Sequence, residues 1–284
     1  MARTLIFYHG NCPDGFGGAY SAWKKFGDTA EYHPLHYGKP EPTDLVGSDV
    51  YFIDFCYEAS SMERIKNEAA SLTVLDHHQG TRAVVESMPH FVFDENRSGA
   101  TIAWSYFHPD VPTPRLLSFV EDGDLFRFVQ PDTRAALSYI YAQPFTFESW
   151  DALRGELESD AGFARIVETG TTYRAYFSIL AKQVADSAEL VSFEGHTVYM
   201  ISTLRAFTSE VGRLLYSKQP PFAMLVAARP DGIRVSLRGD TSVDLSKIAQ
   251  KYGGNGHPGS AAFSLLWGEP IPWKVIEKNE TPRD

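Results

Sequence analysis

The stretch that most constrains the fold is residues 72–80, where a short apolar run passes directly into an aspartate, two histidines and a glycine. Such a run is typical of a buried strand in a parallel sheet. Polar residues at its end lie at the carboxyl edge, where open α/β sheets bind ligands. Burying Asp76, His77 and His78 is costly unless something satisfies them, and a divalent cation does so. The triplet alone is not specific, because a solvated loop could carry it.

Three other apolar segments end in the same way. His9 and Asp14 follow the first, Asp54 ends the second, and a helical approach delivers Asp122 with Asp124 as its rival. The strand–helix–strand pattern predicts parallel strands, whose carboxyl ends gather on one side. We therefore expect these side chains to form one site.

The four motifs in this order, with the Gly-Gly-Asn-Gly-His signature at residues 253–257, resemble the DHH phosphoesterase superfamily over about residues 4–264. The motifs are specific together, although no single one is. The resemblance implies an α/β fold in which a parallel-sheet domain with a helical connector, residues 1–188, binds metal and carries catalysis. A smaller mixed-sheet α/β domain, residues 189–284, would bind substrate, with the active site in the cleft between the two.

Length and apolar content fit this arrangement. A chain of 284 residues exceeds the commonest single-domain size, so two domains are expected. No apolar run approaches the roughly 18 residues of a membrane span, and the first residues lack a signal-peptide cleavage pattern. We expect a cytoplasmic protein with no membrane partner, in which Cys12 and Cys56 are free thiols.

The formal net charge of −10 argues against a surface that tracks long polynucleotides through many phosphate contacts. A short oligonucleotide or small phosphorylated substrate fits this charge better than long duplex DNA. A homodimer is compatible with the sequence.

The resemblance assigns metal ligands to five residues: His9, Asp14, Asp54, His77 and Asp122. Asp122 is preferred to Asp124 because it lies nearest the helix end. Two Mn²⁺ ions are expected, with Mg²⁺ as the alternative. Asp76 and His78 are the catalytic candidates, Asp76 orienting the cluster and His78 facing the substrate phosphate. The alternative for His78 is a packed core histidine.

Cys12 is a departure from the family pattern, because it stands where the first of two motif aspartates is usual. The change either weakens one metal site or puts a thiolate in place of the carboxylate. His9 and Asp14 are the preferred ligands of this motif.

The expected substrate-binding residues are a set of glycines and polar side chains: Ser98, Arg238, Gly254, Asn255, Gly256 and His257. Glycines let backbone N–H groups converge on an anion, and arginine offers a two-pronged donor. Ser98 is equally well explained as a helix cap. Asn255 departs from the family's run of glycines.

These features predict a manganese-dependent hydrolase, a nuclease that cleaves phosphodiester bonds of short oligonucleotides, about two to five residues long, or of small nucleotides by a metal-activated water. Four aromatic residues could stack bases: Tyr8, Phe16, Tyr37 and Phe55. Two alternatives remain open. One is a phosphoanhydride hydrolase of the exopolyphosphatase or pyrophosphatase type, and the other is a catalytically weakened nucleotide-binding regulator, which Cys12 favours.

Residues 148–189 have the apolar spacing of helices and are expected to break at three glycines, Gly155, Gly162 and Gly170.

Overall fold

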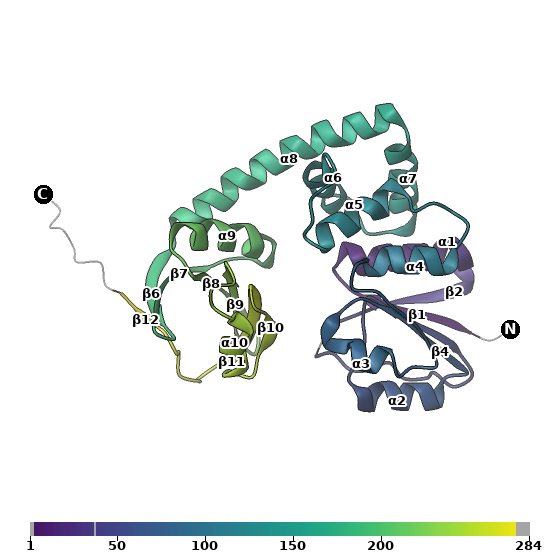
Figure 1. Ribbon diagram of the computed structural model, residues 1–284, viewed down its shortest axis with the longest axis horizontal. Coiled ribbons are helices and arrows are strands. Elements are labelled where there is room, and N and C mark those ends of the chain that lie inside the picture. Colours follow the sequence, from purple (N-terminus) through teal and green to yellow (C-terminus); the bar gives the residue numbers. More distant parts are fainter. Residues whose placement is uncertain (1–2, 37, 277–284) are drawn as a thin grey trace, which may run out of the picture. The chain divides into compact units, whose positions relative to one another are not determined.

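The computed structural model describes residues 3–36 and 38–276 and contains two compact units, Met1–Arg174 and Ala175–Asp284 (Figure 1). The division falls inside one long helix, α8 (Asp160–Asp186). The predicted fold class is confirmed, since the first unit holds a parallel sheet and the second a mixed sheet with helices. The roles assigned to residues 1–188 and 189–284 stay predictions.

The first unit is built on a five-stranded parallel sheet with the order β2-β1-β3-β4-β5. The strands are β1 (Thr4–His9), β2 (Ala30–Leu35), β3 (Asp49–Ile53), β4 (Ser71–Asp76) and β5 (His90–Phe93). All neighbouring pairs are parallel, so every carboxyl end lies at the same edge.

Helices cover both faces of this sheet (Figure 1). The helices α1 (Pro13–Phe26) and α4 (Gly99–Phe107) cover one face, and α2 (Ala59–Glu68) and α3 (Arg82–Val85) the other, with 3₁₀ turns η1 (Gly27–Thr29) and η2 (Gln79–Thr81). On the α1 side Ile53 packs with Ala22. On the α2 side Phe52 packs with Met62. The central strands are apolar because both of their faces are buried.

Four helices follow: α5 (Arg115–Asp124), α6 (Thr133–Tyr141), α7 (Phe147–Glu158) and α8. The predicted breaks at glycine were wrong, because Gly155 lies inside α7 and Gly162 and Gly170 lie inside α8. A Cβ at Gly170 would lie 2.0 Å from the carbonyl oxygen of Ala135. This glycine therefore allows close helix packing instead of ending the helix.

The second unit has a seven-stranded sheet with the order β10-β11-β9-β8-β7-β6-β12, in which only the β7–β8 pair is parallel within the described chain. The strands are β6 (Glu189–Phe193), β7 (His196–Ser202), β8 (Phe222–Arg229), β9 (Gly232–Gly239), β10 (Asn255–His257), β11 (Ser260–Leu266) and β12 (Lys274–Val275). The turn η3 (Arg205–Phe207) precedes α9 (Thr208–Lys218), and α10 (Leu245–Gln250) precedes β10.

The helices α9 and α10 pack on separate cores of this sheet. Leu215 of α9 packs with Leu225, and Leu245 of α10 packs with Leu237. Across residues 3–36 and 38–276, the helices are all too short or too polar to cross a bilayer.

Candidate metal centre and phosphate-binding face

Three adjacent strands deliver the polar residues of the first unit. His9 is the last residue of β1, Asp54 follows β3, and Asp76 ends β4 ahead of His77 and His78. Since β1, β3 and β4 are neighbours and parallel, their ends bring these residues together. The gathering predicted for the residues at the strand ends is therefore present.

Three groups of side chains have ligand atoms lying within 4.8 Å of one another. They are Asp54 with Asp76, His77 and His78; His9 with Cys12 and Asp54; and Asp14 with His77 and Asp124. Asp54 and His77 each belong to two groups. The groups therefore share residues and form one continuous cluster of possible metal ligands.

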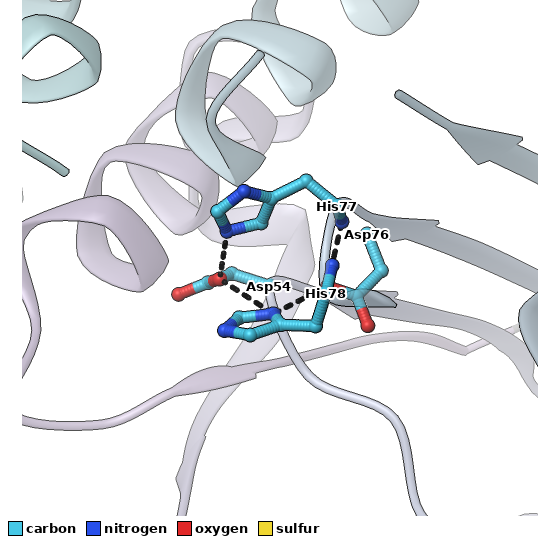
Figure 2. Close-up of side chains that lie close together, drawn as sticks. All are labelled: Asp54, Asp76, His77 and His78. Atoms are coloured by element: carbon cyan, nitrogen blue, oxygen red, sulfur yellow. Dashed lines mark hydrogen bonds and ion pairs between the residues drawn. The ribbon is translucent and has the colours of Figure 1, made fainter. Parts of the chain in front are cut away.

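Asp54 occupies the centre of the cluster and has a left-handed backbone, with φ of 56°. Its Oδ1 lies 3.2 Å from His77 Nε2, and Figure 2 shows the carboxylate between the two histidine rings. Its Oδ2 is buried. This oxygen lies 3.3 Å from His9 Nδ1 but makes no hydrogen bond within the described chain. Strained backbone and an unsatisfied buried oxygen are both typical of functional sites.

Asp14 is held by the first residues of α4. Its carboxylate accepts hydrogen bonds from the backbone N–H groups of Gly99 (2.7 Å) and Ala100 (2.9 Å). A Cβ at Gly99 would lie 2.6 Å from Asp54 Cβ, so only glycine fits there without a shift. Ser98 caps this helix, its hydroxyl accepting from Thr101 N. The predicted contact of Ser98 with substrate stays a prediction.

The structure does not bring Asp122 into the cluster, and Asp124 lies there instead. Residues two apart on a helix face different directions, so α5 can direct only one of them to the strand ends. Asp122 turns to the following loop, where its carboxylate accepts from Val129 N (2.9 Å), Gln130 N (3.2 Å) and the Thr133 hydroxyl. The preference for Asp122 as a ligand is corrected in favour of Asp124.

Burial and mutual repulsion dominate the electrostatics of the cluster. Burial, followed by the charges of Asp54 and Asp124, raises the pKa of Asp14 well above its usual value. Burial and Asp54 raise the pKa of Asp124 to about 6. Burial, with Asp54 and Asp14, also raises the pKa of the Cys12 thiol.

The same carboxylates also raise the pKa values of the histidines, against the effect of burial. Burial by itself lowers the pKa of His77, but the hydrogen bond to Asp54 and the charge of Asp14 outweigh it and raise that pKa to about 9. The cluster is therefore rich in negative charge and in oxygen and nitrogen donors, which suits divalent cations such as Mn²⁺ and Zn²⁺.

Asp76 orients His78. Its Oδ1 lies 2.8 Å from His78 Nδ1 (Figure 2) and accepts from the backbone N–H of His77. Its Oδ2 accepts from the Thr81 hydroxyl. Burial alone would lower the pKa of His78, but this hydrogen bond and the charge of Asp54 raise it. With Nδ1 engaged, Nε2 is the ring nitrogen left for another partner.

In the second unit, strand register places two of the predicted substrate-binding residues, Arg238 and His257, in one row. His257 of β10 is paired with Ser260 of β11, which is paired with Arg238 of β9. Adjacent strands lie about 4.8 Å apart, so the row is about 10 Å long. Because side chains alternate between faces, Asn255 lies on the same face as His257, and Arg234 on the same face as Arg238.

Four arginines extend from this row along β9: Arg238 lies in the row, Arg234 lies four residues before it on the same face, and Arg229 and Arg205 lie near Arg234. Burial, then repulsion from Arg229 and Arg205, lowers the pKa of Arg234, and burial with repulsion from Arg234 lowers that of Arg238. In the described parts of the chain, the ion pairs include an acidic partner for none of the four. We call this row and the four arginines the basic face.

The aromatic residues proposed to stack bases are core residues where the structure describes them. Phe16 packs on Phe147 and Trp150, and Phe55 is fully buried. Tyr8 is half-buried against Phe16, and Tyr37 lies outside the described residues. An exposed aromatic residue lies elsewhere: Phe126, in the loop after Asp124, is 73% exposed.

Comparisons with known proteins agree with the fold. No family model matches the chain. An uncharacterized protein of Acanthamoeba polyphaga mimivirus is 28% identical in an alignment of 302 residues that covers 96% of this chain and 70% of that protein.

Three solved structures share the two-unit fold. The DHH domain of a protein described as a member of the s1p family of ribosomal proteins matches with a TM-score of 0.62 and 13% identity over 93% of this chain and 83% of its own. RecJ from Thermus thermophilus in complex with Mn²⁺ matches with a TM-score of 0.51 and 11% identity over 93% of this chain and 49% of RecJ. A pGpG-specific phosphodiesterase from Vibrio matches with a TM-score of 0.50 and 13% identity over 93% and 94% of the two chains. The protein therefore has the fold of the DHH superfamily, as its motifs predict.

Sequence reasoning missed the arginines near Arg238 and preferred Asp122 of α5, whereas the structure places Asp124 in the cluster. Arg229 and Arg234 could have been noticed because they flank the turn between two predicted strands. Arg205 is more distant in sequence, however, and only the fold brings it close to Arg234.

Proposed function

We propose that this protein is a metal-dependent phosphoesterase that hydrolyses phosphodiester bonds of short oligonucleotides. The observation that carries the proposal is the convergence of carboxylates and imidazoles on Asp54 at the ends of β1, β3 and β4. The Asp54 oxygen that makes no hydrogen bond in the described chain and the mixed nitrogen and oxygen donors fit divalent cations.

Five residues would hold the ions: His9, Asp14, Asp54, His77 and Asp124. Bound divalent ions would polarise a phosphoryl oxygen and lower the pKa of an attacking water. Asp54, which belongs to two of the ligand groups, is the residue best placed to serve both ions. We take Mn²⁺ as the first choice of metal and Mg²⁺ as the alternative.

His78 is proposed to contact the substrate, with Asp76 as its positioning residue. Asp76 holds His78 at Nδ1, so Nε2 can donate a hydrogen bond to a phosphoryl oxygen. The raised pKa of His78 favours the protonated ring, which is the form that donates at both nitrogens.

The basic face of the second unit is proposed to bind substrate phosphate. Arginines without acidic partners in the described chain are expected to attract anions, and guanidinium groups bind phosphate through paired hydrogen bonds. The formal charge of the whole chain is −10, so this local concentration of arginine is not a by-product of composition. His257 and Gly256 of β10, with Gly254 just before the strand, would add donors beside it.

The loop after α5 favours a nucleotide over a polyphosphate. Phe126 and Phe128 both have left-handed backbones, with φ of 55° and 50°. Asp122 holds this loop by accepting from Val129 and Gln130. The strained backbone of these two phenylalanines lowers the stability of the protein, and Phe126 is also largely exposed. A role in stacking on a nucleotide base would explain why the strain is kept. Phe126 is two residues from Asp124, hence within about 7 Å along the backbone.

The direct test is a ladder of 5′-labelled RNA lengths, assayed with the full-length protein and Mn²⁺, with polyphosphate and pyrophosphate in parallel. We expect turnover to be fastest for about two to five nucleotides and to fall for longer strands. D54N and H77A should abolish turnover while the far-ultraviolet circular dichroism is unchanged.

Three results would contradict the proposal. Rates that rise steadily with RNA length would indicate a processive nuclease, and hydrolysis confined to polyphosphate would indicate a phosphoanhydride hydrolase. Nucleotide binding without turnover under any divalent ion would indicate a regulator.

A second experiment tests the aromatic loop. F126A should raise KM for an oligonucleotide by about 5- to 150-fold, the equivalent of one stacked base, and leave kcat for a small phosphodiester unchanged. The matched control is V129A, since Val129 is an exposed apolar residue of the same loop. Equal effects of the two variants would remove Phe126 from substrate binding.

A further inference from the structure

Cys12 lies between the end of β1 and the start of α1, and its side chain is not used to build either element. It is the N-cap residue of α1, yet makes no side-chain capping bond in the described chain. Its backbone carbonyl accepts the hydrogen bond from Phe16 N that opens the helix. Serine, threonine, aspartate or asparagine would be the stabilising choice for a cap, so helix formation does not explain a cysteine here.

The sulfur of Cys12 belongs to a compact group of three different donors. Cys12 Sγ, a ring nitrogen of His9 and a carboxylate oxygen of Asp54 all lie within 4.8 Å of one another. Ligands bind zinc at about 2.0 to 2.3 Å, so donor atoms around one ion are at most about 4.6 Å apart. The three atoms are therefore nearly within reach of a single ion without rearrangement of the backbone.

A second observation points to a ligand at the same place. Asp54 Oδ2 is buried and lacks a hydrogen bond among the described residues, although it lies 3.3 Å from His9 Nδ1. Buried carboxylate oxygens are normally satisfied, and a bound cation would satisfy this one.

This group differs in chemistry from the other three-residue group of the cluster. Asp14, His77 and Asp124 offer nitrogen and oxygen only, which suits Mn²⁺ or Mg²⁺ together with water. The first group adds sulfur, and soft thiolate ligands favour Zn²⁺ and similar ions over Mg²⁺ and Mn²⁺.

We propose that Cys12 is a metal ligand with His9 and Asp54, and that this position prefers a thiophilic divalent ion such as Zn²⁺ while the Asp14 group takes the harder ion. The sulfur binds as a thiolate, and its proton passes to water. This inference rests on the proposed function and deepens it, because that function requires divalent ions but does not distinguish two kinds of position.

Cobalt spectroscopy tests the sulfur ligand directly. Metal-free full-length protein titrated with Co²⁺ should develop the near-ultraviolet thiolate-to-cobalt charge-transfer band. C12S and C12D should lack the band. C56A is the matched control and should keep it, because Cys56 is the buried second cysteine and its thiol bonds to the Tyr57 carbonyl.

A competition experiment tests metal preference. C12D should lower the ratio of Zn²⁺ to Mn²⁺ affinity at least about tenfold, since a carboxylate replaces the thiolate. X-ray absorption of the zinc-loaded wild-type protein should show one sulfur at about 2.3 Å, a measurement that does not depend on any variant folding.

Three outcomes would overturn the proposal: no charge-transfer band in the wild-type protein, a band retained in C12S, or zinc without a sulfur neighbour. None of these readouts requires turnover. Loss of RNA hydrolysis with the band intact would therefore count against the proposed function and leave Cys12 as a ligand.

Discussion

At the scale of single residues, the two aspartates of α5 perform opposite tasks although only one residue separates them. Asp124 adds negative charge to a cluster that already repels it, and Asp122 accepts hydrogen bonds from the loop that follows. The charge of Asp124 therefore lowers the stability of the metal-free protein, and the hydrogen bonds of Asp122 raise it.

Replacing each of the two aspartates in turn should separate their effects on stability and on metal binding. D124N should raise or preserve the melting temperature of the metal-free protein, because it removes a charge whose pKa the cluster raises to about 6. The same variant should lose most of the stabilisation that added Mn²⁺ gives the wild-type protein. Differential scanning calorimetry with and without Mn²⁺ measures both effects.

D122N is the matched control for D124N. It should destabilise the metal-free protein and leave metal binding unchanged. Asparagine keeps one acceptor oxygen where the carboxylate had two, so the metal-free protein should lose about 1 to 3 kcal/mol of unfolding free energy. Its bound metal per chain, measured by elemental analysis, should equal that of wild type. Metal loss in D122N but not in D124N would restore Asp122 as the ligand.

At the scale of elements, the first residues of α4 contact two of the candidate metal ligands, Asp14 and Asp54. Its first N–H groups bind the Asp14 carboxylate, and the absence of a side chain at Gly99 lets the helix approach Asp54. A helix start is suited to this task because its N–H groups have no partner within the helix.

We expect G99A to reduce Mn²⁺ affinity by at least about tenfold and to lower stability, because the new methyl would lie 2.6 Å from Asp54 Cβ and displace either α4 or the aspartate. Isothermal titration measures the affinity, and urea unfolding measures the stability.

G155A is the control for this change. Gly155 lies inside α7, and a Cβ there would meet no heavy atom within 4 Å in the described chain. Alanine should therefore stabilise α7 by up to about 1 kcal/mol and leave metal binding unchanged. Equal metal affinity in G99A and wild type would show that α4 does not position the ligands.

The elements also show what sequence alone could and could not predict. The strands ending at His9, Asp54 and Asp76 were predictable because apolar runs stop abruptly at polar residues. The choice between Asp122 and Asp124 was not, because it depends on the rotation of α5 against the sheet. The predicted helix breaks at the glycines of α8 were wrong because glycine, which often ends a helix, also allows two helices to pack closely.

At the scale of the whole molecule, acidic and basic functions are assigned to separate units. The proposed metal ligands all belong to Met1–Arg174, and the basic face belongs to Ala175–Asp284. Metal binding and phosphate binding should therefore be separable by mutation.

R238A should raise KM about 10- to 100-fold through loss of a charged hydrogen bond to phosphate, with kcat and bound metal unchanged. R213A is the control, since Arg213 of the same unit is already paired with Glu210 at 2.7 Å. Steady-state kinetics and elemental analysis separate the two effects. Metal loss in R238A would contradict the separation.

The left-handed backbone of Asp54 has a consequence for laboratory evolution of this protein. A non-glycine residue in that conformation costs about 1 to 2 kcal/mol, which glycine avoids and asparagine lessens. A library screened for heat resistance alone, without a test of turnover, should therefore accumulate Asp54→Asn early, because asparagine eases the backbone and keeps a side chain that can hydrogen-bond His77. The most heat-stable variants from such a screen would have no catalytic activity. Their sequences would identify Asp54 as a residue that the protein keeps for function although it lowers stability.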